Sequence, residues 1–192
     1  AFATEVQRRA PAELILFVGQ LLPHKRPHEL IAAHHLLTSF HRPDAALVLV
    51  GTPRAPAYFA ALGQFVAMLN LPRVWFTGPL PDPQLAELYR RADVFVTASG
   101  HEGFCVPLVE AMAHSVPVVA TDAGAIPETA GDAALLLPGA DAATFAEAIA
   151  WALAAPERGA MAIEGRARAR ALSPGEVQPR LLAFLRRHRL LP

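Results

Sequence analysis

The 192-residue sequence contains a single cysteine, Cys105. One thiol excludes a disulfide within the chain and a zinc site built on cysteines, and scarce cysteine is typical of a reducing compartment. Basic and acidic side chains are equally frequent, 17 of each, so no overall field draws the chain to nucleic acid or to an anionic bilayer. We therefore expect a cytoplasmic protein with no nucleic-acid partner.

Long hydrophobic runs are also missing. A membrane span needs roughly 18 to 20 apolar residues, and the most apolar stretch, Ala133–Ala155, is interrupted by a Pro-Gly pair and two acidic residues. The N-terminal segment has neither an initiator methionine nor the apolar core of a signal peptide, so residues 1–13 are interpreted as a linker remnant of a longer protein. A hydrophobic content of 53% excludes a disordered chain and predicts a compact core.

Short apolar runs alternate with longer amphipathic segments. The runs have the length of strands buried on both faces and are expected at Leu14–Val18, Ala46–Val50, Val74–Phe76, Val94–Thr97, Val116–Ala120 and Ala134–Leu136. Helices are expected between them at Pro27–Ser39, Ala55–Leu69, Pro83–Arg91, Phe104–Ala113, Ala125–Thr129, Ala142–Ala154 and Glu157–Ala171. Asp82 and Asp141 are suited to cap the helices that follow them. This alternation predicts a doubly wound, Rossmann-like α/β domain over residues 14–172, with helices on both faces of a parallel sheet.

Residues 173–192 depart from the α/β alternation. Two prolines and a glycine precede RLLAFLRRHRLL, which has the pattern of a basic amphipathic helix. Such a helix is suited to pack across a junction with another domain, or to make peripheral contact with the inner face of a membrane. Both alternatives stay open.

The common nucleotide-binding fingerprints do not occur in the sequence. No G-x-G-x-x-G follows the first strand and no G-x-x-x-x-G-K-[ST] is present, which argues against a dehydrogenase or a P-loop NTPase. Ligands of doubly wound sheets bind beyond the carboxyl ends of the strands. The loop after the first strand carries Gly19, Gln20, Lys25 and Arg26, a glycine turn with two cations that suits a phosphate-sized anion. The alternative is a solvated basic loop.

The loop after the fourth strand holds the clearest pattern. It leads into an expected helix through Glu102, Gly103, Phe104, Cys105 and Val106, and reaches Glu110 two turns later. Free N–H groups at a helix N-terminus suit a pyrophosphate, and carboxylates accept hydrogen bonds from pairs of hydroxyls. At the helical rise, eight residues separate the two carboxylates by roughly 12 Å, about the span from a sugar across two phosphates to a ribose. The alternative is a capping arrangement, with Glu102 at the helix dipole and Glu110 solvated.

Histidine and cysteine offer weaker signals. His24 and His28 lie on either side of Pro27, and the adjacent His34 and His35 point apart, so we predict no metal site. His101 and the loop at residues 124–128 either face the ligand or serve packing and turns. A helix N-terminus lowers the pKa of a nearby thiol, but no second cysteine accompanies Cys105, which we interpret as a small packing residue.

Four motifs of this sequence resemble those of the group 1 family of retaining glycosyltransferases, which have the GT-B fold. Four motifs carry the resemblance: Val18, Gly19 and Lys25 in V-G-[RS]-x4-K, Arg90–Ala98 in the ADVFV strand, Glu102 and Glu110 in E-x7-E, and Pro117–Gly131 in P-V-[IV]-A-[ST]-x-x-G-G-[IL]-P-E. They occur in order, and the likeness covers roughly residues 14–171. The chain resembles the C-terminal domain of that fold, which binds the donor.

The resemblance implies roles for the site residues. Glu102 would contact hydroxyls of the donor sugar and Glu110 would hold the ribose. Lys25, beside Gly19 and Gln20, would engage the diphosphate together with the amides of residues 103–106, and would stabilise the leaving diphosphate without a metal. The catalytic residues would be Glu102 and Lys25. The base would lie against the loop at residues 77–82, with Val74 and Leu80 as walls.

The function that the resemblance implies is transfer of a hexose from a UDP-, GDP- or ADP-sugar to a glycan, lipid or small-molecule acceptor. No cofactor is expected. A missing N-terminal domain would bind the acceptor, so the chain alone would have little activity. Many relatives have a phosphate-binding arginine where this sequence has Gln20, and Arg26 is its nearest substitute. A nucleotide-sugar-binding module without activity and a GT-B sugar-nucleotide epimerase are the alternatives.

Overall fold

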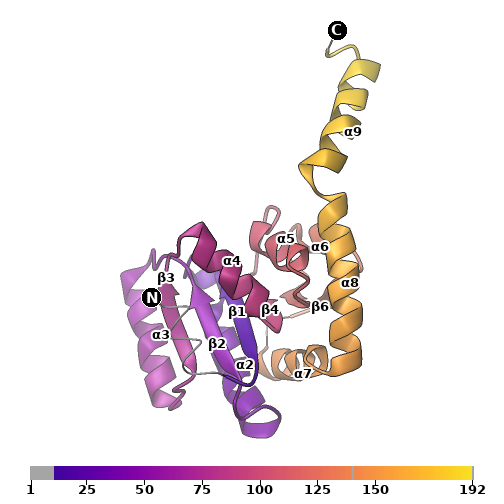
Figure 1. Cartoon of the computed structure of the whole chain (residues 1–192). Helices are drawn as coiled ribbons and strands as arrows, with labels where there is room; N and C mark the ends of the chain where they lie inside the picture. Colours follow the sequence, from indigo (N-terminus) through magenta and orange to yellow (C-terminus); the bar gives the residue numbers. More distant parts are fainter. Residues whose placement is uncertain (1–10, 140, 192) are drawn as a thin grey trace.

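A computed structural model describes residues 11–139 and 141–191. The described residues form a six-stranded parallel sheet in the order β3-β2-β1-β4-β5-β6 (Figure 1). The strands are β1 Leu14–Val18, β2 Ala46–Val50, β3 Val74–Gly78, β4 Val94–Thr97, β5 Val118–Thr121 and β6 Leu135–Leu137. The expected doubly wound Rossmann-like fold is confirmed. Most of the linker expected at residues 1–13 lies outside the described residues.

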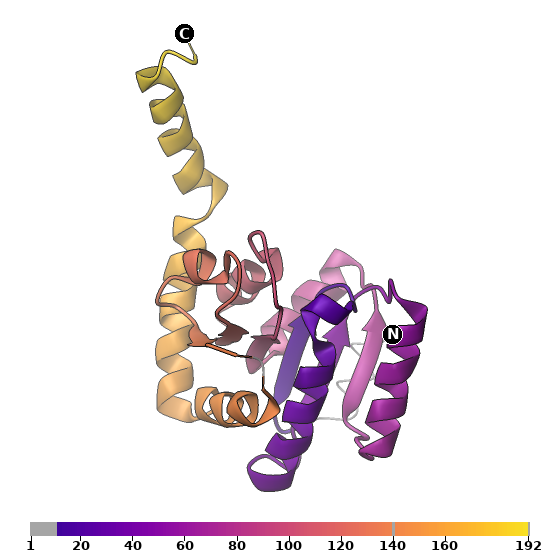
Figure 2. The ribbon, with the colours of Figure 1, turned by 180° about the vertical axis from the view of Figure 1, so that it is seen from behind.

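Helices cover both faces of this sheet. They are α2 Pro27–Phe40, α3 Pro56–Met68, α4 Asp82–Arg91, α5 Val106–Ala113, α6 Ile126–Ala130, α7 Ala142–Ala152, α8 Ala155–Ala171 and α9 Pro174–Arg187, with a short 3-10 helix, η1, at Pro23–Lys25. Figure 1 looks onto the face covered by α4, and Figure 2 looks onto the face covered by α2.

The apolar side chains of the strands divide between two cores. In β1, Ile15 and Phe17 pack with residues of α2, α3 and α7, whereas Leu14 and Leu16 pack with residues of α4 and α5. All four are at most 3% exposed. Burying a side chain of this size stabilises the fold by about 1.5–3 kcal/mol, which explains why the strands are continuous apolar runs.

Several element boundaries differ from the expectation by one or two residues, and two of these differences have a clear cause in the local backbone. The strand expected from Val116 begins at Val118. The Val116 amide donates its hydrogen bond to the carbonyl of Ala111 in the preceding helix, and Pro117 has no N–H to donate to a neighbouring strand. The helix expected from Phe104 begins at Val106, because Cys105 adopts a left-handed conformation with φ 63° and ψ 63°.

The two expected aspartate caps have different outcomes. Asp141 Oδ1 accepts a hydrogen bond of 2.9 Å from the Thr144 amide, as expected of an N-cap. Asp82 is the first residue of α4 and Pro81 occupies the cap position, so that prediction is wrong by one residue. Asp82 still lies in the first turn, where its charge is favourable to the helix dipole.

Helix α9 extends from the end of α8 away from the rest of the domain (Figures 1 and 2). Its apolar residues Val177, Leu181 and Phe184 repeat at helical spacing and are 41–52% exposed. The described residues therefore leave one apolar stripe of α9 uncovered. Among the described residues, no helix has both the length and the apolar character that crossing a membrane requires.

A glycine allows the loops after β1 and β2 to approach each other. Gly51 has φ +145°, and a Cβ at this position would lie 1.8 Å from the carbonyl oxygen of Gly19. The same contact is fixed by hydrogen bonds of 2.9 Å from the Gly19 amide to Val50 and of 3.1 Å from the Leu21 amide to Thr52. Gly51 thus sets the path of the chain toward Lys25.

We predict that Gly51→Ala lowers the free energy of unfolding by at least about 2 kcal/mol, because the methyl group meets a backbone carbonyl and the conformation disfavours a side chain. The matched control is Gly63→Ala in α3, where a Cβ meets no atom within 4 Å. It should raise stability by about 0.5–1 kcal/mol. Chemical denaturation of both variants measures the difference, and equal stabilities would contradict the close approach.

Candidate functional site

The candidate site lies at the switch point of the sheet, where the loops that follow β1 and β4 leave neighbouring strands. Such crevices at the carboxyl ends of strands are the usual ligand sites of doubly wound domains. The two loops are joined directly, because the Gly100 amide donates a 2.8 Å hydrogen bond to the carbonyl of His24. Residues 76 positions apart in the sequence therefore meet here.

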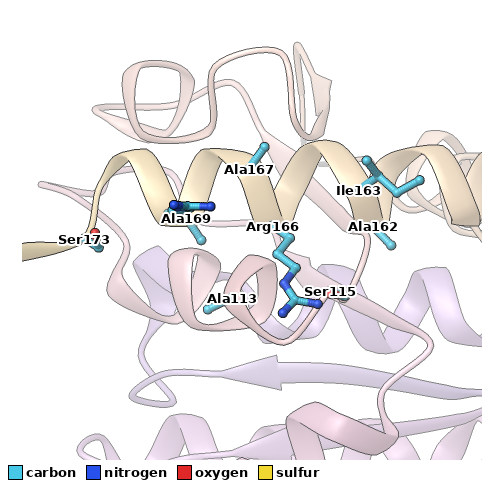
Figure 3. A pocket seen from close by; sticks show the side chains of 9 residues that line it. Ala113, Ser115, Ala162, Ile163, Arg166, Ala167, Ala169 and Ser173 are labelled. Carbon is cyan, nitrogen blue, oxygen red and sulfur yellow. The ribbon is translucent and has the colours of Figure 1, made fainter. Parts of the chain in front are cut away.

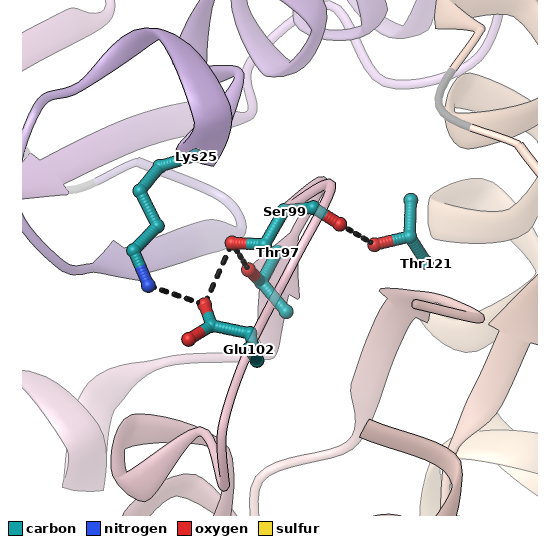
Figure 4. Close-up of polar contacts among 5 residues, drawn as sticks. All are labelled: Lys25, Thr97, Ser99, Glu102 and Thr121. Atoms are coloured by element: carbon teal, nitrogen blue, oxygen red, sulfur yellow. Dashed lines mark hydrogen bonds and ion pairs between the residues drawn. The ribbon is translucent and has the colours of Figure 1, made fainter. Parts of the chain in front are cut away.

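Lys25 and Glu102 form an ion pair between these loops. The Lys25 ammonium lies 2.6 Å from Glu102 Oε1, and the two side chains are 19% and 11% exposed. The same Oε1 accepts a 2.7 Å hydrogen bond from the Ser99 hydroxyl (Figure 4). The sequence analysis placed both charged residues in the site, and the structure brings them into contact.

Hydroxyl groups of β4 and β5 support this pair. Because the Ser99 hydroxyl gives its proton to Glu102, the Thr97 hydroxyl 3.2 Å away donates to Ser99. Thr121 donates a 2.6 Å hydrogen bond to the Ser99 carbonyl, which extends the chain of contacts to the next strand (Figure 4). All three hydroxyl residues are at most 3% exposed. The orientation of Glu102 is therefore fixed from the interior of the sheet.

The loop before α6 supports the backbone of Glu102. The Ala125 amide donates a 2.9 Å hydrogen bond to the Glu102 carbonyl. Gly124 has φ +58°, and a Cβ there would lie 2.5 Å from that carbonyl oxygen. The loop at residues 124–128, for which a ligand contact and a plain turn were both expected, thus packs its backbone against Glu102.

The start of α5 presents free amide groups. Among residues 11–139 and 141–191, nothing accepts a hydrogen bond from the amides of Gly103, Phe104, Cys105 or Val106. Gly103, Phe104 and Val106 are exposed. Unpaired amides at a helix N-terminus carry partial positive charge, so this turn can accept an anion.

Cys105 is buried between the helix start and the sheet, with 7% exposure. Burial, followed by the negative charge of Glu102, raises the pKa of its thiol to about 11. The lowering considered from the helix N-terminus is therefore wrong, because desolvation outweighs the helix dipole. Cys105 has a left-handed backbone conformation, which glycine adopts more readily than other residues. Its burial agrees with the interpretation of Cys105 as a small packing residue.

Glu110 lies on α5 and is held by a residue that the sequence analysis missed. The Tyr89 hydroxyl donates a 2.8 Å hydrogen bond to Glu110 Oε2. Both residues line a cavity of about 180 Å³ between α4 and α5, together with Asp82, Leu85, Ala86 and His114. Since residues 102–105 are not helical, the 12 Å estimate based on helical rise does not apply to the carboxylate spacing.

The remaining candidates lie at different distances from the site. Gln20 is exposed in the loop after β1, and Leu80 is half-buried in the loop after β3. Arg26 extends to the loop after β4, where its guanidinium would lie 3.1 Å from a Cβ on Gly100. Val74 is the first residue of β3 and is 7% exposed in the core. It is at the amino end of its strand, so its assignment as a wall of the base pocket is wrong.

The histidines differ in their exposure within the part of the chain that the structure describes. In the described parts of the chain, no three His, Cys, Asp or Glu side chains are grouped to hold a metal ion. His34 is 2% exposed and its Nε2 lies 3.0 Å from the Ala45 carbonyl. Burial lowers the pKa of His34 to about 4, as expected of a neutral core histidine. His101 is exposed beside Glu102.

A larger cavity lies away from the strand ends. It has a volume of about 820 Å³ and is formed between α8 and the end of α5, by mostly small side chains together with Arg166 and Arg170 (Figure 3). Neither Lys25 nor either glutamate lines it. This larger cavity is therefore separate from the candidate site formed by the loops after β1 and β4.

Comparison with known proteins finds a family and a fold that cover most of the chain. The model of the family described as glycosyl transferases group 1 matches residues 4–169. A relative from Catenulispora acidiphila, named D-inositol 3-phosphate glycosyltransferase 2, is 31% identical over an alignment that covers 91% of this chain and 45% of the relative. The chain spans between 24% and 45% of the curated relatives it matches.

Two solved structures extend the likeness to the fold. The Anabaena HepE protein, in complex with UDP and glucose, superposes with a TM-score of 0.75 and 27% identity over 87% of this chain and 46% of HepE. The C-terminal domain of LpcC, a group 1 glycosyl transferase from Francisella tularensis, superposes with a TM-score of 0.76 and 27% identity. That likeness covers 88% of this chain and 90% of the LpcC domain.

We predict that Cys105 is almost inert toward thiol reagents in the folded chain. With a pKa near 11, its thiolate fraction at pH 8 is roughly two orders of magnitude below that of free cysteine, and burial limits access further. The rate of reaction with Ellman's reagent, measured with and without denaturant, tests this. Labelling of the native chain as fast as that of free cysteine would contradict the burial and the raised pKa.

Proposed function

This chain belongs to the group 1 glycosyl transferases, and on that premise we propose that it is the domain that binds the nucleoside-diphosphate-sugar donor of a retaining hexosyltransferase. Residues 14–172 form the donor-binding unit. The donor occupies the crevice at the switch point between β1 and β4, and the sugar is transferred to an acceptor held by a separate N-terminal domain.

The contact between Lys25 and Glu102 carries this proposal. In a sugar nucleotide a single oxygen links the anomeric carbon to the terminal phosphorus, so a cation for that phosphate and a carboxylate for the sugar hydroxyls must be neighbours. Here the ammonium and the carboxylate are 2.6 Å apart, at a ligand-binding edge of the sheet. The ammonium has three N–H groups, so it can donate to a phosphate and retain Glu102.

The start of α5 supplies the second part of the phosphate site. Its free amides at residues 103–106 and the positive end of its dipole accept the diphosphate beside Lys25. When the bond between the anomeric carbon and the phosphate oxygen breaks, the electron pair leaves with the nucleoside diphosphate. Lys25 and these amides stabilise that charge, and fixed donors of this kind act without reorganisation during the reaction.

The nucleoside lies along α5 toward α4. Glu110 accepts hydrogen bonds from the ribose hydroxyls, and the loop at residues 77–82 with Leu80 contacts the base. UDP-, GDP- and ADP-sugars are the donor candidates. The HepE complex with UDP and glucose, at 27% identity, makes UDP the first probe.

The exposed stripe of α9 supports a two-domain protein. Helix α9 packs across the junction with the N-terminal domain, because the described residues leave Val177, Leu181 and Phe184 without apolar cover. The acceptor site lies on that domain, so this chain alone has little transferase activity. The reaction takes place in the cytoplasm, and the arginines of α9 suit contact with the inner face of the membrane when the acceptor is a lipid.

A second function follows from Gln20. It brings no charge to the phosphate loop, which favours a module that binds the nucleotide sugar without transferring it. The reach of Arg26 to the loop after β4 favours the enzyme, since its charge can replace the missing one. Donor consumption by the chain joined to its natural N-terminal half separates the two functions. An enzyme consumes donor and loses activity in Lys25→Ala, whereas a binding module consumes none.

We predict that the chain binds at least one of UDP, GDP and ADP in titration calorimetry. Each of Lys25→Ala and Glu110→Ala removes hydrogen bonds to a charged group, worth about 1.5–3 kcal/mol, so affinity should fall roughly 10- to 100-fold. Matched controls are Arg170→Ala, in the cavity between α5 and α8, and Glu147→Ala, on α7 and 72% exposed. Both should bind as the wild type does.

Two results would contradict the proposal. One is that none of the three nucleotides binds to the folded chain. The other is that Arg170→Ala weakens binding while Lys25→Ala does not, because this would move the nucleotide to the cavity between α5 and α8. Circular dichroism of each variant establishes that the fold is retained.

A further inference from the structure

Tyr89 is a buried residue whose hydroxyl reaches the candidate site. Its ring is 2% exposed and lies against Phe95 at 6.4 Å and against His114 at 5.3 Å, nearly parallel to the latter. The hydroxyl donates to Glu110 Oε2 at 2.8 Å and is 3.3 Å from the Pro107 carbonyl. Tyr89 therefore connects α4 to the first turn of α5 and to one oxygen of the Glu110 carboxylate.

The direction of this hydrogen bond is fixed. Burial, followed by the charge of Glu110, raises the pKa of the Tyr89 hydroxyl above its ordinary value, so the phenol stays protonated. A protonated phenol beside a carboxylate acts as the donor, and bonds of this charge-assisted kind are stronger than neutral ones. Tyr89 thus holds Oε2 and leaves the other oxygen, Oε1, for a different donor.

The packing of Tyr89 makes it a rigid support. A glutamate on a helix surface has three rotatable side-chain bonds, and fixing them on binding costs conformational entropy and lowers affinity. The Tyr89 ring is buried and packs against both Phe95 and His114, which restricts the movement of its hydroxyl. The cavity that Tyr89 and Glu110 line together is also lined by Asp82 and Leu85 on α4.

We propose that Tyr89 is a positioning residue that holds Glu110 ready for the 2′ and 3′ hydroxyls of a ribose, and so makes the site select ribonucleotides over nucleotides that lack these hydroxyls. The inference rests on the proposed function, because it needs a nucleoside beside α5. It adds to that function the residue that sets how strongly the sugar of the nucleoside is recognised.

The test compares two ligands on three forms of the chain. The ligands are whichever of UDP, GDP and ADP binds the wild type most tightly and its 2′,3′-dideoxy counterpart. Tyr89→Phe keeps the ring and removes only the hydroxyl. The matched control is Tyr58→Phe, which removes the hydroxyl that contacts His28 at 2.6 Å, on the opposite face of the sheet.

We expect the wild type to prefer the ribonucleotide by at least about 10-fold, the value of one charge-assisted hydrogen bond. Tyr89→Phe should reduce this preference at least about 3-fold, with the affinity for the dideoxy ligand changed by less than about 2-fold. Tyr58→Phe should keep the wild-type preference. Loss of the preference without loss of dideoxy binding separates positioning of Glu110 from general support of the fold.

A second variant keeps the test decisive if Tyr89→Phe does not fold. Glu110→Asp retains the charge but withdraws the carboxylate by one methylene from the fixed Tyr89 hydroxyl. It should lose the preference for the ribonucleotide to a similar extent. Retention of the full preference in Glu110→Asp would overturn the inference.

The outcomes also distinguish this inference from the function on which it rests. If the wild type binds none of UDP, GDP and ADP, the proposed function fails and the inference fails with it. If the wild type prefers the ribonucleotide and Tyr89→Phe does so equally, only the inference is overturned. If Tyr89→Phe weakens both ligands by the same factor, Tyr89 supports the fold and the inference is again overturned.

Discussion

The ion pair between Lys25 and Glu102 is the interaction on which the site depends. It joins the loops after β1 and β4, and it forms only because the strand order places these two strands side by side at the switch point of the sheet. A partly buried pair gains stability only when hydrogen bonds offset the loss of hydration, and Ser99 supplies one to the same carboxylate oxygen. The pair also determines which ligand groups can bind, since it places the Lys25 ammonium, which has three N–H donors, next to the Glu102 carboxylate, which accepts hydrogen bonds from hydroxyl groups.

The surrounding structure serves to keep this pair in place. Because Gly51 and Gly124 have no side chain, the loop after β2 can pack against the loop after β1, and the loop before α6 can pack against the loop after β4. Cys105 adopts a left-handed conformation just before α5, and the amides of residues 103–106 have no acceptor among the described residues. Site groups on strand ends and a helix start are better fixed than groups on a long flexible loop, which suits a site that must hold charge in a defined geometry.

Much of this arrangement could be predicted from the sequence, for physical reasons that differ between elements. The ranges expected for β1, β2 and β4 agree with the structure at both ends, because strands buried on two faces require unbroken apolar runs. The boundaries of β5 and α5 could not be predicted, because they depend on Pro117 and on the conformation of Cys105. Val74 was misplaced although it is the first residue of the expected strand, because ligands of doubly wound sheets lie beyond the carboxyl ends of the strands and Val74 is at the amino end of β3. Tyr89 was missed because a tyrosine on the apolar side of a helix has the pattern of a core residue, and its partner lies 21 residues away.

In the proposed function, the start of α5 and Lys25 together hold a diphosphate. The decisive measurement is a crystal structure of this chain with bound UDP. We expect terminal phosphate oxygens within hydrogen-bonding distance of the amides of residues 103–106 and of the Lys25 ammonium, with the ribose against Glu110. A nucleotide bound in the cavity between α5 and α8, or a diphosphate that leaves those amides without a partner, would contradict it.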